Sequence, residues 1–280
     1  MTSDATLVAF GPDHLAGAVR LSQQADWPHR LEDWRMALAL SKGCAAVSDQ
    51  GSRVIGTALL TPYGSDAATI NMVIVDASVR GRGLGRKLMD EVLALAGDRS
   101  LRLVATESGM PLYEKLGFRM SGAVVQHQGH VAESVAVPAG VRAARPDDIA
   151  AIIELDRAAY GADRGSLMSH LASVGSLAVL ERVGRPVGFS ALRPFGRGEV
   201  IGPVVAANRD DARTLVSHFL AARSGAFVRI DTDARTGLGP WLADIGLSHV
   251  GGGFAMHRPI VAAPAERSVL TFALANQAFG

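Results

Sequence analysis

Three glycines and four basic residues gather between residues 80 and 87 of this 280-residue chain, in the sequence RGRGLGRK. An apolar, β-branched run typical of a buried strand precedes them, and leucines and a valine at helical spacing follow. Glycines leave room for a ligand, and the free N–H groups at a helix start attract anions. The pattern therefore predicts a strand, a turn that binds a pyrophosphate group, and a helix.

Two common phosphate-binding motifs do not fit this turn. A dinucleotide fingerprint needs glycine at Arg86, and a Walker A loop needs serine or threonine at Leu88. The pattern Arg-x-x-Gly-x-Gly resembles the acetyl-CoA loop of the GNAT N-acetyltransferase superfamily, although an ordinary basic connection is the alternative for the loop alone. The resemblance assigns these residues to acetyl-CoA: Val73, Ile74, Val75, Arg80, Gly81, Arg82, Gly83, Leu84, Gly85 and Arg86.

A second motif, MPLYEKLGF from Met110 to Phe118, follows a strand-like run that ends at Thr106. In the GNAT superfamily a short helix ending in Tyr-Glu-x-Leu-Gly-Phe follows the fifth strand, and its tyrosine is the usual general acid toward the coenzyme A thiolate. Tyr113 is similar in position, so the resemblance implies that role for it. Thr106 stands where the family often has asparagine, and it is assigned to cofactor binding. A surface tyrosine that only packs is the alternative for this motif alone.

Composition is that of a globular protein, with 48% hydrophobic and 20% charged residues, and the length suggests about two domains. No apolar run reaches the roughly 18 residues that span a membrane, and no secretion signal is recognisable at the N-terminus. A net charge of +1 gives no reason to expect nucleic acid or an anionic membrane as a partner. The single cysteine, Cys44, predicts a reducing, cytoplasmic location, and no metal is expected.

The segment ADWPHRLEDW holds two of the three tryptophans. In GNAT folds the segment between the first two helices lines the acceptor site. The residues expected to shape an acceptor pocket are therefore Trp27, His29, Arg30 and Trp34. A helix–helix connection whose tryptophans merely pack is the alternative.

The general base is left open by the sequence, because the central strand offers Asn71 and Thr69 but no glutamate. Asn71 is predicted to contact the acceptor. The candidates for the base, acting directly or through water, are Glu107, His29 and Asp26.

The second half of the chain repeats the first. The sequence GPWLADIGL, from Gly239 to Leu247, echoes MPLYEKLGF, and two earlier stretches repeat in the same order. This predicts an α+β fold of two tandem GNAT-like domains, each a mixed, mainly antiparallel sheet flanked by helices. The predicted division is a catalytic acetyl-CoA-binding domain at 1–137, a degenerate domain at 141–262 and an extension at 263–280.

The second copy lacks the features that would bind the cofactor. Its turn after the strand has no glycine, Asp210 and Asp211 stand where a phosphate would approach, and Leu242 replaces the tyrosine. One acetyl-CoA per chain is therefore expected. The second copy would serve as a scaffold, a homodimer surface or a wall of the acceptor pocket.

Two further features of the second copy are ambiguous. Asp231 and Asp233 alternate along a strand and so share one face, where they would hold an ammonium group of the acceptor or form a solvated strand end. The extension is expected to be either an extra strand or a partner-binding arm.

The resemblance implies direct transfer of an acetyl group from acetyl-CoA to a primary amine of a small molecule, such as an amino acid derivative or an amine toxin. Protein N-termini or lysines are the alternative acceptors. A non-catalytic acyl-CoA-binding sensor is the alternative from another class.

Overall fold

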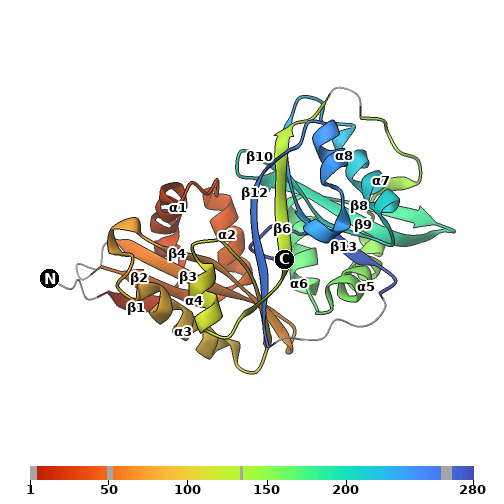
Figure 1. Cartoon of the computed structure of the whole chain (residues 1–280). Coiled ribbons are helices and arrows are strands. Elements are labelled where there is room, and N and C mark those ends of the chain that lie inside the picture. The colour runs from red at the N-terminus through yellow and green to blue at the C-terminus, as the bar shows by residue number, and fades with distance from the viewer. Residues whose placement is uncertain (1–4, 49–52, 133–134, 260–266) are drawn as a thin grey trace.

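The computed structural model describes residues 5–48, 53–132, 135–259 and 267–280. Within these ranges one thirteen-stranded sheet runs through the molecule, with helices on both faces (Figure 1). Most neighbouring strands are antiparallel, which confirms the predicted α+β class. The start of the predicted extension, at 263–266, lies outside the described residues.

The first half of the chain follows the predicted order of elements. The strand, turn and helix around the glycines are confirmed, since the strand ends at Val75 and the helix begins at Leu84. The elements are β1 (Thr6–Ala9), η1 (Pro12–His14), α1 (Leu15–Gln24), α2 (Leu31–Leu40), β2 (Lys42–Val47), β3 (Val54–Tyr63), β4 (Ala67–Val75), η2 (Ala77–Val79), α3 (Leu84–Ala96), β5 (Ser100–Ala105), α4 (Met110–Lys115) and β6 (Arg119–His130).

The second half repeats this order, as predicted, and adds one strand. The extension contributes that strand, so of the two structures expected for it the described part has the extra strand. The elements are β7 (Val141–Ala143), η3 (Pro146–Asp148), α5 (Ile149–Tyr160), α6 (Gly165–Val174), β8 (Ser176–Arg182), β9 (Arg185–Phe195), β10 (Gly198–Ala206), α7 (Arg209–Leu220), β11 (Phe227–Asp233), η4 (Ala234–Thr236), α8 (Gly239–Asp244), β12 (Ser248–Arg258) and β13 (Leu270–Ala273).

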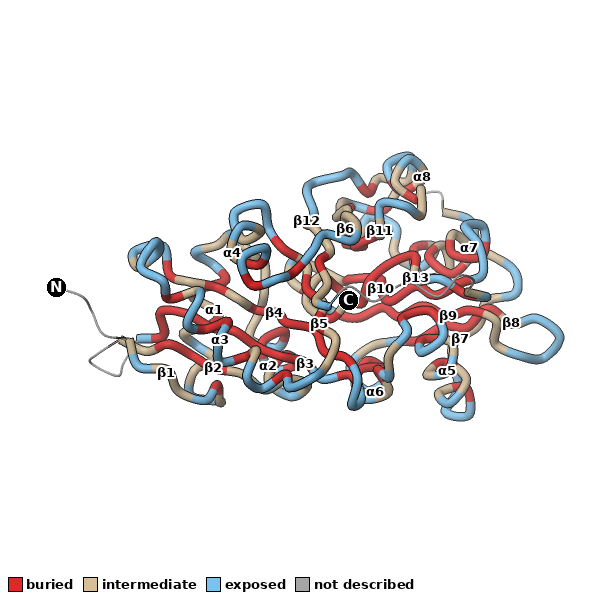
Figure 2. Tube along the Cα trace, turned by 60° about the horizontal axis from the view of Figure 1, so that its bottom comes forward, coloured by how far each residue is buried: buried red, intermediate tan, exposed pale blue. Residues whose placement is uncertain are grey.

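Three hydrophobic cores cover the sheet, and its most deeply buried strands are β3 and β4 in the first half and β9 and β10 in the second (Figure 2). Side chains of α1, α2, α5 and α6 form one core that spans both halves. A second core contains α3 and α4, and a third contains α7 and α8. Helical spacing places Leu84, Leu88 and Val92 on the buried face of α3, where each contributes about 1.5–3 kcal/mol by leaving water.

The two halves exchange a strand at the centre of the sheet. The strand order is β1-β2-β3-β4-β5-β12-β6-β11-β13-β10-β9-β8-β7. β6 follows α4 in the chain but pairs with β11 and β12, and β12 follows α8 but pairs with β5 and β6. Each half therefore completes the sheet of the other, and the sheet is continuous across the predicted domain boundary.

Glycines in β12 allow this close crossing. At Gly252 a Cβ would lie 2.0 Å from the Val124 carbonyl oxygen of β6, whereas at Gly251 no atom lies within 4 Å of that position. Both glycines have a positive φ, of 156° and 147°, so both substitutions strain the backbone.

We predict that Gly252→Ala lowers the free energy of unfolding by about 1–3 kcal/mol more than Gly251→Ala, because only the first drives a methyl group into β6. Guanidinium unfolding of both variants measures the difference. Equal stabilities would contradict the packing of β12 on β6.

Candidate active site

Strands β4 and β5 lie side by side only at their beginnings. Their parallel pairing covers residues 67–69 of β4 and 100–102 of β5. Further along, β4 keeps β3 as a neighbour while β5 pairs on its other side with β12. Backbone polar groups in a sheet need partners, so the second part of β4 offers an open edge to an extended ligand.

Met72 bulges from this open part of β4. Its φ of 51° is unusual for a residue other than glycine, and the β3–β4 register shifts between Thr57 and Leu59. The Thr57 hydroxyl donates a hydrogen bond of 2.7 Å to the Met72 carbonyl. The bulge therefore interrupts the ladder with β3 at a point where β4 has no other strand beside it.

Asp76 fixes the turn that leads from β4 to the glycines. Its buried carboxylate accepts hydrogen bonds from the Ser78 N–H and hydroxyl, at 3.0 and 2.7 Å, and pairs with Arg53. Burial alone would raise the pKa of Asp76, but these bonds outweigh it and hold the pKa well below its usual range. The carboxylate is therefore charged at neutral pH and keeps the turn in place.

The glycine-rich turn is open and positively charged. Gly81 and Gly83 have φ values of 76° and 81°, and no atom lies within 4 Å of a Cβ position at either. Gly83 is the N-cap of α3, so N–H groups of the first helical turn are available to an anion. Arg80 donates to the Val75 carbonyl at 3.1 Å, and Arg82 is exposed beside it. These residues fit a pyrophosphate group.

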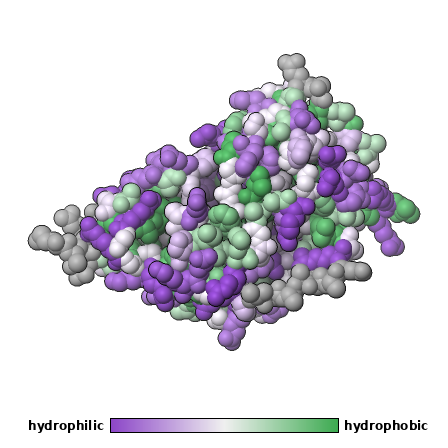
Figure 3. Space-filling model, in the orientation of Figure 1, coloured by the Kyte–Doolittle hydropathy of each residue, from purple (hydrophilic) through white to green (hydrophobic). Residues whose placement is uncertain are grey.

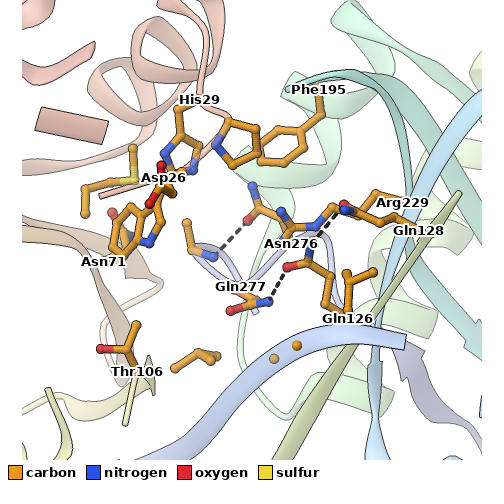
Figure 4. A pocket seen from close by; sticks show the side chains of 18 of the residues that line it. Asp26, His29, Asn71, Thr106, Gln126, Gln128, Phe195, Arg229, Asn276 and Gln277 are labelled. Carbon is orange, nitrogen blue, oxygen red and sulfur yellow. Dashed lines mark hydrogen bonds between the residues drawn. The ribbon is translucent and has the colours of Figure 1, made fainter. Parts of the chain in front are cut away.

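A cavity of about 370 Å³ lies between the halves, next to the open edge of β4. Its side chains come from both halves and from the segment after β13 (Figure 4). The lining residues of the first half that precede β6 are Asp26, Trp27, Pro28, His29, Ile70, Asn71, Met72, Val73, Val104, Thr106 and Tyr113.

Tyr113 reaches the cavity from α4. Its ring packs edge-on against Phe118, with centroids 6.1 Å apart, and Gly109 makes room for it, since a Cβ there would lie 3.1 Å from the ring. Burial raises the pKa of Tyr113 to about 12, so the hydroxyl is protonated at neutral pH. Among the described residues the hydroxyl has no hydrogen-bond partner, which leaves it free to donate to a ligand.

The predicted acceptor segment divides between the cavity and the core. Trp27 and His29 line the cavity, in a T-shaped contact with centroids 5.6 Å apart. The predicted placement is wrong for Trp34, which is fully buried and donates from Nε1 to the Ser22 hydroxyl at 3.0 Å. Trp34 lies in the first turn of α2, and that turn faces the core that α1 shares.

Arg30 also has a structural position and does not line the cavity, which corrects its predicted placement. Its guanidinium pairs with Asp33 at 3.1 Å at the start of α2. Asp33 in turn accepts from the Gly196 N–H at 3.2 Å and lies 3.6 Å from Arg193, both in the second half. Arg30 therefore belongs to a polar junction between the halves.

Of the three candidates for the base, two line the cavity. Glu107 is exposed in the turn between β5 and α4 and does not line it, which corrects its predicted placement. Asp26 lines the cavity and forms no ion pair with any described residue. Asn71 also lines the cavity, and its Oδ1 atom is buried and has no partner among the described residues.

His29 is poorly suited to accept a proton. Its Nδ1 lies 3.1 Å from the Ser22 hydroxyl, and its ring touches Trp34 and Phe195 edge-on, with centroids 6.3 and 5.6 Å apart. Loss of hydration in this apolar setting lowers the pKa of His29 to about 4. The imidazole is therefore neutral at pH 7, and a group of so low a pKa is an inefficient general base.

Asp231 and Asp233 do not line the cavity, so the predicted pair of carboxylates for an ammonium group is wrong. Asp231 is fully buried, and Arg229 and Gln277 donate to it at 2.9 and 3.1 Å. Asp233 is bound by Arg235 and caps η4. Both carboxylates thus have local partners, and a solvated strand end fits only the partly exposed Asp233.

The second copy forms part of the far wall of the cavity, which is one of the three roles expected for it, but the residues of this wall were not predicted. The wall combines side-chain amides of β6, charged groups of the second half and the chain after β13. The alternation of residues along β11 could have indicated Arg229, because it shares a strand face with Asp231. The amides of β6 could not have been indicated, because nothing in the sequence showed that β6 is the neighbour of β11. The residues of this wall are Gln126, Gln128, Phe195, Arg197, Arg229, Val250, Gly251, Gly252, Asn276, Gln277 and Ala278.

The corresponding gap in the second half is filled. β10 and β11 pair in parallel only at residues 199–201 and 228–230 and then separate, as β4 and β5 do. β13 enters between them and pairs with both, at residues 204–206 of β10 and at Thr232 of β11. The backbone that is open in the first half is therefore satisfied by the chain itself in the second.

Two family models described as "Acetyltransferase (GNAT) domain" match the chain, at residues 41–120 and 152–270. Each match falls within one of the two copies of the repeated order of elements. The chain is a tandem member of the GNAT acetyltransferase superfamily. No helix within the described ranges has the length and apolar character to cross a membrane.

Two sequence relatives of this tandem GNAT protein are named as N-acetyltransferases. It is 27% identical over 230 residues to YitH of Bacillus subtilis, named an uncharacterized N-acetyltransferase, with 80% of this chain and 81% of that one covered. It is 37% identical over 76 residues to glucosamine 6-phosphate N-acetyltransferase of Trypanosoma brucei brucei, covering 24% of this chain and 52% of the relative.

Solved structures share the fold of the tandem GNAT protein. A putative acetyltransferase from Pyrococcus horikoshii superposes with a TM-score of 0.80 at 19% identity, covering 99% of this chain and 96% of that one. A tandem GNAT protein from the clavulanic acid biosynthesis pathway gives 0.63 at 18% identity, covering 94% and 100%. At these identities the likeness shows the fold alone.

We predict that the His29 imidazole stays neutral from pH 5.5 to pH 8. Because the folded pKa lies below the unfolded value of 6.5, its contribution to stability is complete above pH 6.5 and is lost as the pH falls toward 4. NMR titration of the ring carbon shift, assigned with His29→Gln, measures the midpoint. A midpoint above pH 6 would contradict the buried, neutral imidazole.

Proposed function

We propose that this GNAT acetyltransferase transfers the acetyl group of acetyl-CoA to a primary amine of a small molecule, directly and inside the cavity between its halves. The observation that carries the proposal is the composition of that cavity. The open backbone of β4, the Tyr113 hydroxyl and a polar wall from the second half all line it. A cofactor, a proton donor and an acceptor would therefore meet in one space.

Acetyl-CoA, which GNAT enzymes use in general, supplies the acetyl thioester. The turn from Arg80 to Gly85 would hold its pyrophosphate, and the open edge of β4 around Val73 would pair with its pantetheine arm. The bulge at Met72 frees backbone next to the cavity, where an N–H group can polarise an acyl oxygen. Only the first half has this combination among the described residues, which supports one acetyl-CoA per chain.

Tyr113 supplies the proton that the reaction needs at sulfur. A bond forms between the acceptor nitrogen and the acetyl carbon, the carbon–sulfur bond breaks, and the electron pair stays on sulfur. With a pKa of about 12 the hydroxyl holds its proton across the neutral range and donates it toward that sulfur. Asp26 is the best-placed candidate to receive the proton of the ammonium group, directly or through water.

Direct transfer is favoured by the state of Cys44, the single cysteine of the chain. Its thiol is buried, lies 3.8 Å from the Leu88 carbonyl and does not line the cavity. Burial raises the pKa of Cys44 to about 11, which keeps it a thiol. An acyl-enzyme on this residue is therefore disfavoured, and the buried thiol is compatible with a cytoplasmic location.

A small acceptor fits the cavity better than a protein chain. Its volume of about 370 Å³ is in the range of small-molecule sites, and both halves enclose it. The relative from Trypanosoma brucei brucei is named for an amino-sugar substrate, which is such an acceptor. A sensor that only binds acyl-CoA is the second candidate, but the polar wall and the free Tyr113 hydroxyl favour an enzyme.

Release of free thiol from acetyl-CoA, followed across a panel of amino acids, amino sugars, polyamines and peptides, tests the proposal. We expect one class of small amine to stimulate release, with an N-acetylated product in mass spectra. Stimulation only by peptides would replace the small acceptor with a protein. Tight acetyl-CoA binding without any stimulation would favour the sensor.

We predict that Tyr113→Phe lowers kcat by about 10–1000-fold while acetyl-CoA affinity stays near that of the wild type, because only the hydroxyl is removed. The wild-type kcat should show no loss from tyrosine ionisation between pH 7 and pH 10, since the raised pKa of Tyr113 keeps the donor protonated there. Steady-state kinetics over this range measure both effects. Full activity of Tyr113→Phe would show that sulfur takes its proton elsewhere.

We predict that Gly83→Ala weakens acetyl-CoA binding by about tenfold or more, because a side chain would enter the anion site and strain the turn. Gly184→Ala is the matched control, since Gly184 also has a positive φ and no atom within 4 Å of its Cβ position. It lies between β8 and β9 of the second half and not in the glycine-rich turn. Titration calorimetry should give one site per chain. Two equal sites, or equal affinities of the two variants, would overturn the loop assignment.

A further inference from the structure

The far wall of the cavity carries a fixed arginine. Arg229 of β11 uses Nε and Nη2 to bind the fully buried Asp231, at 3.0 and 2.9 Å. The Arg229 guanidinium also stacks near the Phe195 ring, with its central carbon 5.2 Å from the ring centroid. These contacts fix the plane of the guanidinium. Among the described residues Nη1 has no partner, and the side chain lines the cavity with 10% of its surface exposed.

A row of amides next to Arg229 ends in a second free donor. Gln277 donates to Gln126 at 3.2 Å and to Asp231 at 3.1 Å, and Gln126 donates to Gln128 at 3.0 Å (Figure 4). The side-chain oxygens of Gln126 and Gln128 thus accept hydrogen bonds within the row, and the NH₂ group of Gln128 stays unpaired within the described structure. Gln128 lies directly across from Arg229 on neighbouring strands, so the two donors are close together.

The opposite wall has the opposite charge. Asp26 lies across the cavity from Arg229 in Figure 4 and has no ion pair with the described residues. The third charged residue of the lining, Arg197, is exposed. A ligand with a cation at one end and an anion at the other would match these groups, whereas a simple alkylamine would leave the Arg229 donors unpaired.

We propose that the acceptor is an amine that also bears a carboxylate or a phosphate ester, and that Arg229 and Gln128 bind this anionic group. The inference rests on the proposed function and names the class of its substrate. A guanidinium held by a buried carboxylate is pre-oriented, so little order is lost when an anion arrives. Acetylation turns the ammonium into a neutral amide, which removes the attraction to Asp26 and favours release of the product.

The test compares matched amines that differ only in the anionic group. β-Alanine against β-alaninamide probes a carboxylate, and phosphoethanolamine against ethanolamine and glucosamine 6-phosphate against glucosamine probe a phosphate ester. We expect the anionic member of at least one kind of pair to have a kcat/KM about 10–100-fold higher, as a charge-assisted hydrogen-bond pair gives. If the carboxylate pair shows this higher kcat/KM, the anion is a carboxylate, and if a phosphate pair shows it, the anion is a phosphate ester.

Removal of Arg229 alone would leave Asp231 charged and buried without a cationic partner, so the variant is the double substitution R229Q/D231N. It keeps hydrogen-bonding groups at both positions and removes the guanidinium. The ratio of kcat/KM between the anionic and the neutral amine of a pair should fall to about threefold or less in this variant. The control, R223Q/E199Q, removes a paired arginine and carboxylate that do not line the cavity, and it should keep the wild-type ratio.

Calorimetry with N-acetyl-β-alanine against N-acetyl-β-alaninamide, and with phosphoethanolamine against ethanolamine, tests the subsite without turnover. Anion-dependent binding that is lost in R229Q/D231N supports it, even if no amine releases thiol and the proposed transfer is thereby contradicted. Turnover of neutral and anionic amines at equal rates would overturn the subsite and leave the transferase standing. An anionic preference that survives in R229Q/D231N would also overturn it.

Discussion

Backbone polar groups in the middle of a sheet need partners, and two parallel strands that separate lose them. Both copies of the GNAT fold in this chain separate at the same place, after the pairing of residues 67–69 with 100–102 and of residues 199–201 with 228–230. The second copy meets the need with its own strand β13. In the first copy the second part of β4 has no strand on this side, and a cavity reaches the open edge of β4. The need of these backbone groups for partners therefore distinguishes the two copies. The copy with the open edge is suited to a cofactor, and the copy with the filled gap supports the first copy.

The candidate active site belongs to neither half alone. Its cavity exists where β6, β12 and the segment after β13 cross between the halves, and buried polar contacts hold that crossing together. Asp33 binds groups of both halves, and the buried Tyr63 hydroxyl of the first half donates to the Phe279 carbonyl at 2.6 Å. On the face shown in Figure 3, hydrophilic and hydrophobic side chains are interspersed, whereas the core formed by α1, α2, α5 and α6 joins apolar side chains of both halves.

Local patterns in the sequence predicted the part of the site that local structure determines. The strand β4, the glycine-rich turn, the helix α3 and the position of Tyr113 follow from residues close together in the chain. Side chains whose environment depends on distant elements were predicted poorly: Trp34 and Asp231 look available in the sequence but are buried against partners. The exchange of β6 and β12 could not be predicted either, because the pattern of a strand indicates which of its faces is buried but not which strand lies beside it.

The position of β12 has a consequence for synthesis of the protein. β5 ends at Ala105, but its neighbour on one side begins only at Ser248, so most of the chain must leave the ribosome before that edge is covered. At about 5–20 residues per second this delay is on the order of ten seconds, during which a bare strand edge is exposed to other chains. The sheet of the first half therefore cannot be completed during its synthesis. We expect nascent chains to need a chaperone that covers the edge of β5 until β12 has been synthesised.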